Sequence, residues 1–292
     1  MSSSEYQRIG IVSFVDKALI KESVSKLTRF LSSKGIAICV ESQTFCDDNI
    51  ENLNLCSRAE MREMCDLIIM VGGDGSLLFA ARDFADADIP ILGVNRGRLG
   101  FLTDIAPSEM EERVADVLAG NCVATHRFLL EMELVRDGEV IAENIALNDV
   151  VMQPRGSIRM IEFSLRIDDQ YVYTQRSDGL IISTPTGSTA YALSGGGPII
   201  HPTLEAINIV PINPQTLSSR PIVISAGAEI EVKIEQGNSV DTQLVCDGQI
   251  YMDAERGDIV CVRRKAKGVK LLHPIEHDFY ATCRSKLNWA ND

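Results

Sequence analysis

The chain lacks any long apolar run, and no stretch approaches the ~18 to 20 residues that a membrane-spanning helix needs. Its first eight residues also lack the apolar core of a secretory signal. Basic residues are scarce, because 28 Lys and Arg against 41 Asp and Glu give a net charge of −13. Such a charge repels nucleic-acid phosphates and anionic lipid head groups. We therefore expect a cytoplasmic protein that binds neither nucleic acid nor membrane and that binds any phosphate through a local device.

The eight cysteines form no C-x-x-C pair, and several lie within apolar runs, which is typical of reduced, structural thiols. His273 and His277 have an H-x-x-x-H spacing, but neither a cysteine pair nor an H-E-x-x-H core accompanies them. That spacing alone is weak evidence for zinc. The sequence therefore assigns no residue as a metal ligand.

A length of 292 residues, 45% hydrophobic and 24% charged, is typical of a globular protein of about two domains. Residues 1–124 alternate apolar runs with segments of helical spacing, which predicts a Rossmann-like parallel α/β domain. Ser108 and Glu111 form a capping pattern that predicts the start of a helix running to Leu118. The other predicted helices are 17–34 and 76–82, and the predicted strands are 8–14, 36–40, 66–71 and 90–94.

From Arg127 onward apolar and polar residues alternate, and Asp137-Gly138 separates two such runs as a hairpin turn would. The same pattern recurs at 168–170, 237–238 and 257–258. It predicts an antiparallel, β-sandwich-like domain over residues 125–272. For residues 273–292, which lose the alternation, a return to the first domain is one interpretation that nothing in their spacing requires.

The loop Gly72-Gly73-Asp74-Gly75 follows a buried strand and opens a helix, where free backbone N–H groups and the helix dipole favour an anion. It is not a Walker A element, and Leu78 interrupts a G-x-G-x-x-G pattern. Spacing alone leaves phosphate binding and a plain turn equally open. A carboxylate at Asp74 is unfavourable among phosphates unless it binds a metal or accepts a proton from an attacking hydroxyl. The loop therefore indicates phosphoryl transfer.

A second informative stretch runs from Ser177 to Gly197, where a short strand enters a turn rich in hydroxyls and glycine, and Ala190 could begin a helix. Clusters of Ser, Thr and Gly are usually simple loops. A long small-residue segment around one aromatic, Tyr191, is an entropically costly connection, which favours a nucleotide pocket.

These motifs, together with Asn95-Arg-Gly-Arg-Leu-Gly-Phe-Leu102 and Leu147-Asn-Asp149, resemble the bacterial NAD kinase family, whose members phosphorylate NAD to NADP. The resemblance covers most of the chain. The Gly-Gly-Asp-Gly loop is also found in diacylglycerol, sphingosine and phosphofructokinase-like kinases, whereas the run Ser183-Thr-Pro-Thr-Gly-Ser-Thr-Ala-Tyr191 is far more specific. The resemblance implies NAD bound between the two domains, ATP with Mg²⁺ as phosphate donor, and a homodimer or homotetramer.

The resemblance also implies roles for individual residues. Asp74 would take the proton from the adenosine ribose 2′-hydroxyl as it attacks the γ-phosphorus of ATP, and Gly75 would offer a backbone N–H. Asp178 would bond the nicotinamide end, and two arginines would lie near phosphates. Gln249 is a weaker candidate, because Asp247-Gly248 before it is equally readable as a hairpin turn. The remaining residues are the arginines Arg159 and Arg176 and the adenosine contacts Asn148, Asp149, Thr189, Ala190, Tyr191 and Ser194.

Three positions depart from or modify the family pattern. Asp149 replaces the Glu of many members, so its ribose contact is expected to include water. Ser76 replaces the commoner Thr and keeps the hydroxyl. Arg176, where members that use polyphosphate tend to have Gly, favours ATP as the donor.

Two other functions stay open at this level. A lipid or small-alcohol kinase would share only the Gly-Gly-Asp-Gly loop, and it would need a basic or apolar membrane-facing patch that the charge of −13 and the absence of a long amphipathic stretch do not supply. A non-catalytic NAD(H)-sensing module would bind the dinucleotide without consuming ATP, and the intact Asp74 argues against it.

Overall fold

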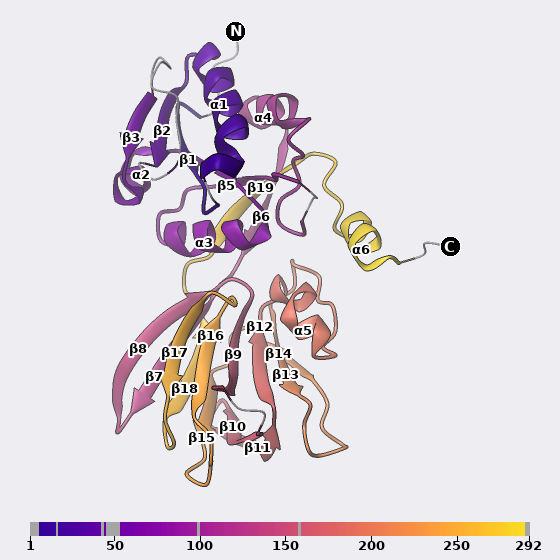
Figure 1. The fold of residues 1–292 in the computed structure, drawn as a ribbon. Helices are drawn as coiled ribbons and strands as arrows, with labels where there is room; N and C mark the ends of the chain where they lie inside the picture. The colour runs from indigo at the N-terminus through magenta and orange to yellow at the C-terminus, as the bar shows by residue number, and fades with distance from the viewer. Residues whose placement is uncertain are drawn as a thin grey trace. The chain divides into compact units, whose positions relative to one another are not determined.

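The computed structural model describes residues 6–15, 17–41, 44, 53–97, 100–156 and 159–289. The chain divides into two compact units, Met1–His126 with Val269–Asp292 (unit 1) and Arg127–Gly268 (unit 2). No helix of the described residues is both long and apolar enough to cross a membrane. Figure 1 draws both units and labels most of their helices and strands.

Unit 1 is built on a seven-stranded sheet of order β3-β2-β1-β4-β5-β19-β6, in which the pairs from β3 to β19 are parallel. Its strands are β1 (Arg8–Val12), β2 (Ala37–Glu41), β3 (Leu53–Cys56), β4 (Leu67–Val71), β5 (Ile91–Val94), β6 (Cys122–Arg127) and β19 (Val269–Pro274). Its helices are α1 (Lys17–Ser33), α2 (Arg58–Met64), α3 (Asp74–Phe84), α4 (Met110–Leu118) and α6 (Phe279–Leu287).

The core of unit 1 forms where the apolar faces of the helices pack against strands that are apolar throughout. Helix α1 buries Val24 and Leu27, and α4 buries Val114, in one cluster with strand residues such as Ile11 and Leu92. Gly35, at φ +72°, ends α1 in the left-handed conformation that glycine adopts without strain. Strands buried on both faces explain why these runs are apolar throughout rather than alternating.

The capping pattern predicted at Ser108 and Glu111 is wrong. Helix α4 begins at Met110, and the residue at its N-cap is Glu109, which makes no side-chain capping hydrogen bond. Ser108 lies one position too early, within the turn in which the N–H of Glu109 donates to the carbonyl of Ala106.

Unit 2 consists of two six-stranded sheets, β11-β10-β15-β18-β7-β8 and β14-β13-β12-β9-β16-β17. Each registered pair is antiparallel. The bounds are β7 (Leu130–Arg136), β8 (Glu139–Ala146), β9 (Asp149–Pro154), β10 (Ile161–Ile167), β11 (Gln170–Ser177), β12 (Gly179–Ser183), β13 (Ala206–Ile212), β14 (Ile222–Ser225), β15 (Ile230–Ile234), β16 (Thr242–Cys246), β17 (Ile250–Ala254) and β18 (Ile259–Arg264), with the short helices η1 (Gly187–Thr189) and α5 (Tyr191–Ser194).

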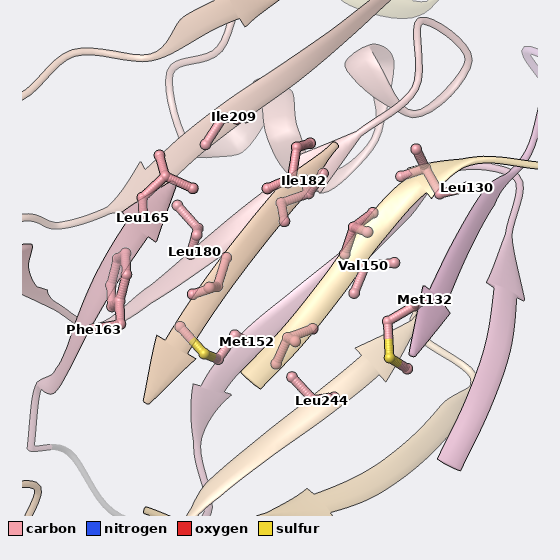
Figure 2. Close-up of a cluster of buried hydrophobic side chains, with 14 of the residues drawn as sticks. Leu130, Met132, Val150, Met152, Phe163, Leu165, Leu180, Ile182, Ile209 and Leu244 are labelled. Carbon is pink, nitrogen blue, oxygen red and sulfur yellow. The ribbon is translucent and has the colours of Figure 1, made fainter. Parts of the chain in front are cut away.

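The two sheets of unit 2 share one core (Figure 2). Phe163 and Met132 come from one sheet and Leu180, Val150 and Leu244 from the other, and all belong to one buried cluster. This is the packing of a β-sandwich. The predicted fold class, a parallel α/β domain followed by an antiparallel sandwich-like domain, is therefore confirmed.

Two of the four predicted hairpin turns connect paired strands and have the backbone that the sequence predicts. Asp137 and Gly138 have φ of 50° and 83° between β7 and β8, and Asp168 and Asp169 have 49° and 61° between β10 and β11. Two consecutive positive φ angles match the right-handed twist of the strands they connect.

The other two hairpin predictions are wrong. Residues 237–238 connect β15 to β16 and residues 257–258 connect β17 to β18. Each of these pairs is divided between the two sheets, so the chain crosses from one sheet to the other there.

Candidate functional site

The glycine-rich loop lies where β4 ends and α3 begins, at the carboxyl end of a parallel strand. Gly73, which has no side chain to cap the helix, is the N-cap of α3. A Cβ at Gly72 would lie 2.5 Å from Oγ of Ser76, whereas a Cβ at Gly73 would meet nothing within 4 Å. The loop thus packs tightly at Gly72 and has open space beside Gly73, at a helix N-terminus whose dipole favours an anion.

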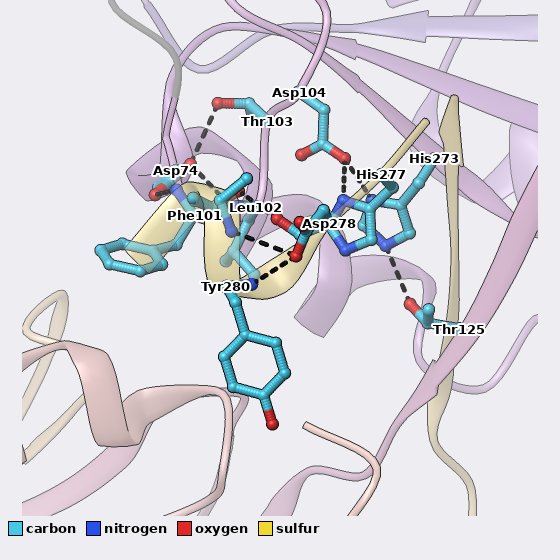
Figure 3. Close-up of polar contacts among 12 residues, drawn as sticks. Asp74, Phe101, Leu102, Thr103, Asp104, Thr125, His273, His277, Asp278 and Tyr280 are labelled. Atoms are coloured by element: carbon cyan, nitrogen blue, oxygen red, sulfur yellow. Dashed lines mark hydrogen bonds and ion pairs between the residues drawn. The ribbon is translucent and has the colours of Figure 1, made fainter. Parts of the chain in front are cut away.

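Asp74, the first residue of α3, is oriented by a segment that follows β5 (Figure 3). Its carboxylate accepts hydrogen bonds from the backbone N–H of Phe101 (2.7 Å) and Leu102 (3.1 Å) and from Oγ1 of Thr103 (3.0 Å). Thr103 in turn accepts from Nδ2 of Asn95 at 2.7 Å. These three donors hold the Asp74 carboxylate in one orientation at the start of α3.

Gly100 is required by this arrangement. A Cβ at that position would lie 1.8 Å from Oδ1 of Asp74, a distance that would force the carboxylate to move. The segment Gly100–Thr103, here called the Asp74-binding segment, therefore approaches the carboxylate as closely as a backbone can. The sequence motif from Asn95 to Leu102 contains part of this segment, but sequence reasoning missed Thr103 as a contact of Asp74.

In unit 2, Asn148 and Asp149 lie at the start of β9, and other side chains fix their backbone. The carboxylate of Asp247 accepts the N–H groups of Leu147 (3.0 Å), Asn148 (2.7 Å) and Asp149 (3.3 Å). Oγ1 of Thr184 donates to the carbonyl of Leu147 at 2.6 Å. Sequence reasoning missed this role of Asp247, because a side chain that accepts hydrogen bonds about a hundred residues away leaves no local signal.

A pocket of about 260 Å³ in unit 2 brings together four of the predicted residues, Asn148, Asp149, Ala190 and Tyr191, with Asp247. Within the described part of the chain, the buried Oδ1 of Asn148 has no hydrogen-bond partner. Leaving such an atom unpaired costs about 1–3 kcal/mol, which a ligand donor would recover. Tyr191 is 44% exposed and offers an aromatic ring at the same pocket.

Asp149 is only 4% exposed. Its burial raises the pKa of the carboxyl to about 7, and the negative charge of Asp247 adds to the rise. A carboxyl that titrates near neutral pH can act as donor or acceptor, so hydroxyl groups of a ligand can pair with it in either state.

The other residues predicted near the adenosine flank this pocket without lining it. Thr189 ends η1 and donates to the carbonyl of Thr186 at 3.3 Å, and Ser194 ends α5. Gln249 follows Asp247 and Gly248, whose φ angles of 53° and 67° confirm the hairpin interpretation of that pair. The role predicted for Gln249 stays a prediction.

Arg159, Arg176 and Asp178 lie at the opposite end of the strands. Asp178 precedes β12, whereas the turn that leads to Tyr191 follows it, so at about 3.3 Å per residue the strand separates them by roughly 16 Å. Oδ2 of Asp178 accepts from Nδ2 of Asn213 at 3.0 Å, and both arginines are exposed. The structure therefore does not bring these three residues into the pocket that holds Asn148.

Unit 1 also contains a cluster of one carboxyl and two imidazole side chains. Asp104, His273 and His277 place one possible ligand atom each within 4.8 Å of the others. Oδ2 of Asp104 accepts from Nδ1 of His273 (2.6 Å) and from Nδ1 of His277 (2.8 Å). Burial alone would raise the pKa of Asp104, but these hydrogen bonds hold it well below its usual range. Sequence reasoning missed Asp104, which is 169 residues from His273.

The side chains of this cluster are already bonded to one another. The two imidazole rings are stacked, with centroids 4.0 Å apart and an interplanar angle of 21°, and Nδ1 of each ring is bonded to the same carboxylate oxygen, Oδ2 of Asp104. Nε2 of His273 is bonded to Oγ1 of Thr125 at 2.8 Å. Every polar atom named here thus has a protein partner, and the cluster is explained as a hydrogen-bonded network.

Comparison with known proteins relates both units to one family. Residues 9–122 match the ATP-NAD kinase N-terminal domain and residues 147–273 match the ATP-NAD kinase C-terminal domain. The chain is 50% identical over 286 residues to an NAD kinase of Teredinibacter turnerae, covering 98% of each chain. It is also 50% identical over 290 residues to an NAD kinase of Saccharophagus degradans, covering 99% and 98%.

Two solved structures share the fold. Yeast NADH kinase, crystallised with NADH, superposes with a TM-score of 0.88 at 26% identity and covers 100% of this chain and 93% of its own. An NAD kinase from Archaeoglobus fulgidus in complex with ATP gives a TM-score of 0.75 at 25% identity and covers 96% and 98%.

Proposed function

The chain belongs to the NAD kinase family, and from that premise we propose that it transfers the γ-phosphate of ATP to the 2′-hydroxyl of the adenosine ribose of NAD, giving NADP and ADP. The observation that carries the proposal is the pocket at Asn148, where the buried and unpaired amide oxygen Oδ1 lies in the same pocket as the buried carboxyl of Asp149. An adenosine offers both an adenine edge for the amide and ribose hydroxyls for the carboxyl.

In this proposal unit 2 recognises the adenosine. The amide of Asn148 pairs with the adenine edge, and Asp149 accepts from a ribose hydroxyl. Ala190 and Tyr191 supply apolar contact and an aromatic face, while Thr189 and Ser194 contribute from the neighbouring turns. Because Asp247 and Thr184 already fix the backbone before β9, little conformational entropy is lost on binding.

Asp74 is proposed as the general base. As the ribose 2′-oxygen forms its bond to the γ-phosphorus, the bond from that phosphorus to the β-phosphate oxygen breaks, and the 2′-hydroxyl proton moves to the Asp74 carboxylate. The donors from Phe101, Leu102 and Thr103 orient the carboxylate before the reaction. The N–H of Gly75, in the first turn of α3, would contact a phosphate.

Mg²⁺ enters this proposal with ATP. Within the described residues the only grouped metal-ligand side chains are Asp104, His273 and His277, and nitrogen ligands are not those that Mg²⁺ prefers. The phosphates of ATP would therefore supply the ion's ligands. We further propose that Arg159 and Arg176 bind phosphate, that Asp178 and Gln249 contact the dinucleotide, that the protein is cytoplasmic, and that it forms a homodimer or homotetramer.

The test is NADP formation from NAD, ATP and Mg²⁺, measured with an NADP-specific dehydrogenase, for the wild-type protein and for Asp74→Asn. We expect the variant to lose about 10²–10⁴-fold in kcat, because the base is gone, while calorimetry shows NAD affinity largely unchanged. Full activity of Asp74→Asn would exclude Asp74 as the base.

The same experiment separates the alternative functions. A wild-type protein that binds NAD tightly but forms no NADP with ATP would be an NAD(H)-sensing module or would use another donor. Turnover of diacylglycerol or a small alcohol, in place of NAD, would indicate the lipid or small-alcohol kinase.

A further inference from the structure

Two sets of hydrogen bonds hold the Asp74-binding segment and the residue that follows it. On one side, Phe101, Leu102 and Thr103 donate to Asp74. The next residue, Asp104, accepts hydrogen bonds from both His273 and His277 through one carboxylate oxygen. Thr103 and Asp104 are adjacent, so any displacement of the Asp104 backbone is passed directly to a donor of Asp74 (Figure 3).

The two histidines come from the far end of the chain. His273 lies in β19, which pairs with β5, and His277 follows it in the turn before α6, where its N–H donates to the carbonyl of Pro274 at 3.0 Å. The side chain of His273 is 1% exposed and that of His277 is 12% exposed. These rings are thus set by the sheet and by a closed turn, and they form a rigid support for Asp104.

The protonation pattern of the network follows from its acceptors. A carboxylate that is ionised only accepts, so Nδ1 of each histidine carries the hydrogen that it donates to Asp104. Nε2 of His273 can then accept the hydroxyl proton of Thr125. Both Nδ1 atoms and Nε2 of His273 thus have protein partners, which fixes the orientation of the two stacked rings.

We propose that His273 and His277 are positioning residues of the phosphoryl-transfer site: by fixing Asp104 they keep the Asp74-binding segment in the conformation that orients the Asp74 carboxylate. This inference rests on the proposed function in one respect, the role of Asp74 as the base. The histidines themselves touch neither Asp74 nor, in this proposal, any substrate. Their loss is expected to change kcat far more than KM, because the adenosine contacts of unit 2 are untouched.

The test uses His277, the more accessible ring. The amide nitrogen of Asn can occupy the position of Nδ1, so His277→Asn keeps a donor to Asp104, whereas His277→Leu has similar bulk and no donor. We expect His277→Leu to lose about 10–100-fold in kcat, as a small misplacement of a reacting group does. The KM for NAD should stay nearly constant, and His277→Asn should recover most of the loss. His126→Leu, at an exposed histidine of β6, is the matched control.

A second readout does not depend on activity. The amide hydrogens of Phe101 and Leu102 donate to Asp74, so their exchange with solvent, followed by NMR, reports directly on the segment. We expect exchange at both amides to rise about tenfold or more in His277→Leu, while amides of β1 and β4 stay protected. Unchanged exchange in His277→Leu, together with unchanged kcat, would overturn the positioning role.

The two proposals fail in different ways. If Asp74 is not the base, Asp74→Asn stays active while His277→Leu still loosens the segment. If the histidines do not position the Asp74-binding segment, Asp74→Asn is inactive, while His277→Leu keeps the wild-type kcat and the wild-type amide exchange at Phe101 and Leu102. Elemental analysis covers the remaining case: one equivalent of zinc in the wild-type protein that is lost in His277→Leu would replace the hydrogen-bonded network with a metal site.

Discussion

At the scale of single residues, the pocket of unit 2 concentrates two carboxyl groups in a small buried volume. Asp247 stabilises the fold, because its carboxylate accepts hydrogen bonds from the backbone N–H groups of Leu147, Asn148 and Asp149. Within the described residues the Asp149 carboxylate accepts no such hydrogen bonds, and its burial next to Asp247 raises its pKa to about 7. The fold therefore tolerates an unfavourable charge at Asp149, which is expected where a ligand later supplies the missing partners.

The raised pKa of Asp149 predicts that the free energy of unfolding depends on pH. The pKa of Asp149 is about 7 in the folded protein and about 4 when unfolded. Between these values the folded state binds more protons, so the carboxyl's contribution to the free energy of unfolding falls as pH rises from 4 to 7 and is constant above. Asp149→Asn, which cannot ionise, should be more stable than wild type at pH 8, by on the order of 2–4 kcal/mol.

The measurement is denaturant unfolding of the nucleotide-free protein at several pH values from 5 to 8. The advantage of Asp149→Asn should shrink steadily as pH falls towards 5. Asp241→Asn removes the same charge from an exposed position and serves as control. A stability difference between wild type and Asp149→Asn that does not vary with pH would show that the carboxyl does not titrate in this window.

At the scale of elements, the loop between β4 and α3 and the segment after β5 act as one device, because neither orients Asp74 alone. Gly100→Ala tests the close approach of the Gly100 backbone to the Asp74 carboxylate. The added Cβ would lie 1.8 Å from Oδ1 of Asp74 and must displace the carboxylate. We expect about a 100-fold fall in kcat, with NAD affinity nearly unchanged and a stability loss of about 1–3 kcal/mol.

Kinetics and NAD calorimetry on Gly100→Ala measure these effects. Gly227→Ala is the control, because its added Cβ would meet only Oγ of Ser225 at an ordinary 3.7 Å. If Gly100→Ala kept wild-type kcat, the conformation of the Asp74 carboxylate would not matter for turnover, and the contacts of Phe101 and Leu102 would be structural only.

The elements also show where sequence reasoning reaches its limit. Helix α3 after the Gly-Gly-Asp-Gly loop and the Asp137-Gly138 hairpin were predictable, since their determinants lie within a few residues. The contact of Thr103 with Asp74 spans 29 positions, and that of His273 with Asp104 spans 169. Such pairs are set by strand order and not by spacing. The capping error at Ser108 has a different cause, because short polar side chains also stabilise turns.

At the scale of the whole molecule, the chain returns to its first unit after completing its second. Strand β19 lies between β5 and β6 in the seven-stranded sheet, with Leu272 opposite Leu92, so the core of unit 1 closes only when residues 269–274 are in place. The core of unit 2 contains none of these residues. The two units therefore depend on different parts of the sequence for their stability.

Leu272→Ala should separate the two cores experimentally. Leu272 is 3% exposed, and truncating it should cost unit 1 about 2–5 kcal/mol. Hydrogen exchange followed by mass spectrometry should then show faster exchange in β1 and β4, while β9 and β12 keep their wild-type protection. Ile275→Ala removes the same number of carbons from a side chain that is 64% exposed and should change neither unit. Equal loss of protection in both units of Leu272→Ala would instead mean that the chain unfolds as one cooperative body, in which the late return of β19 stabilises the sandwich as much as the parallel sheet.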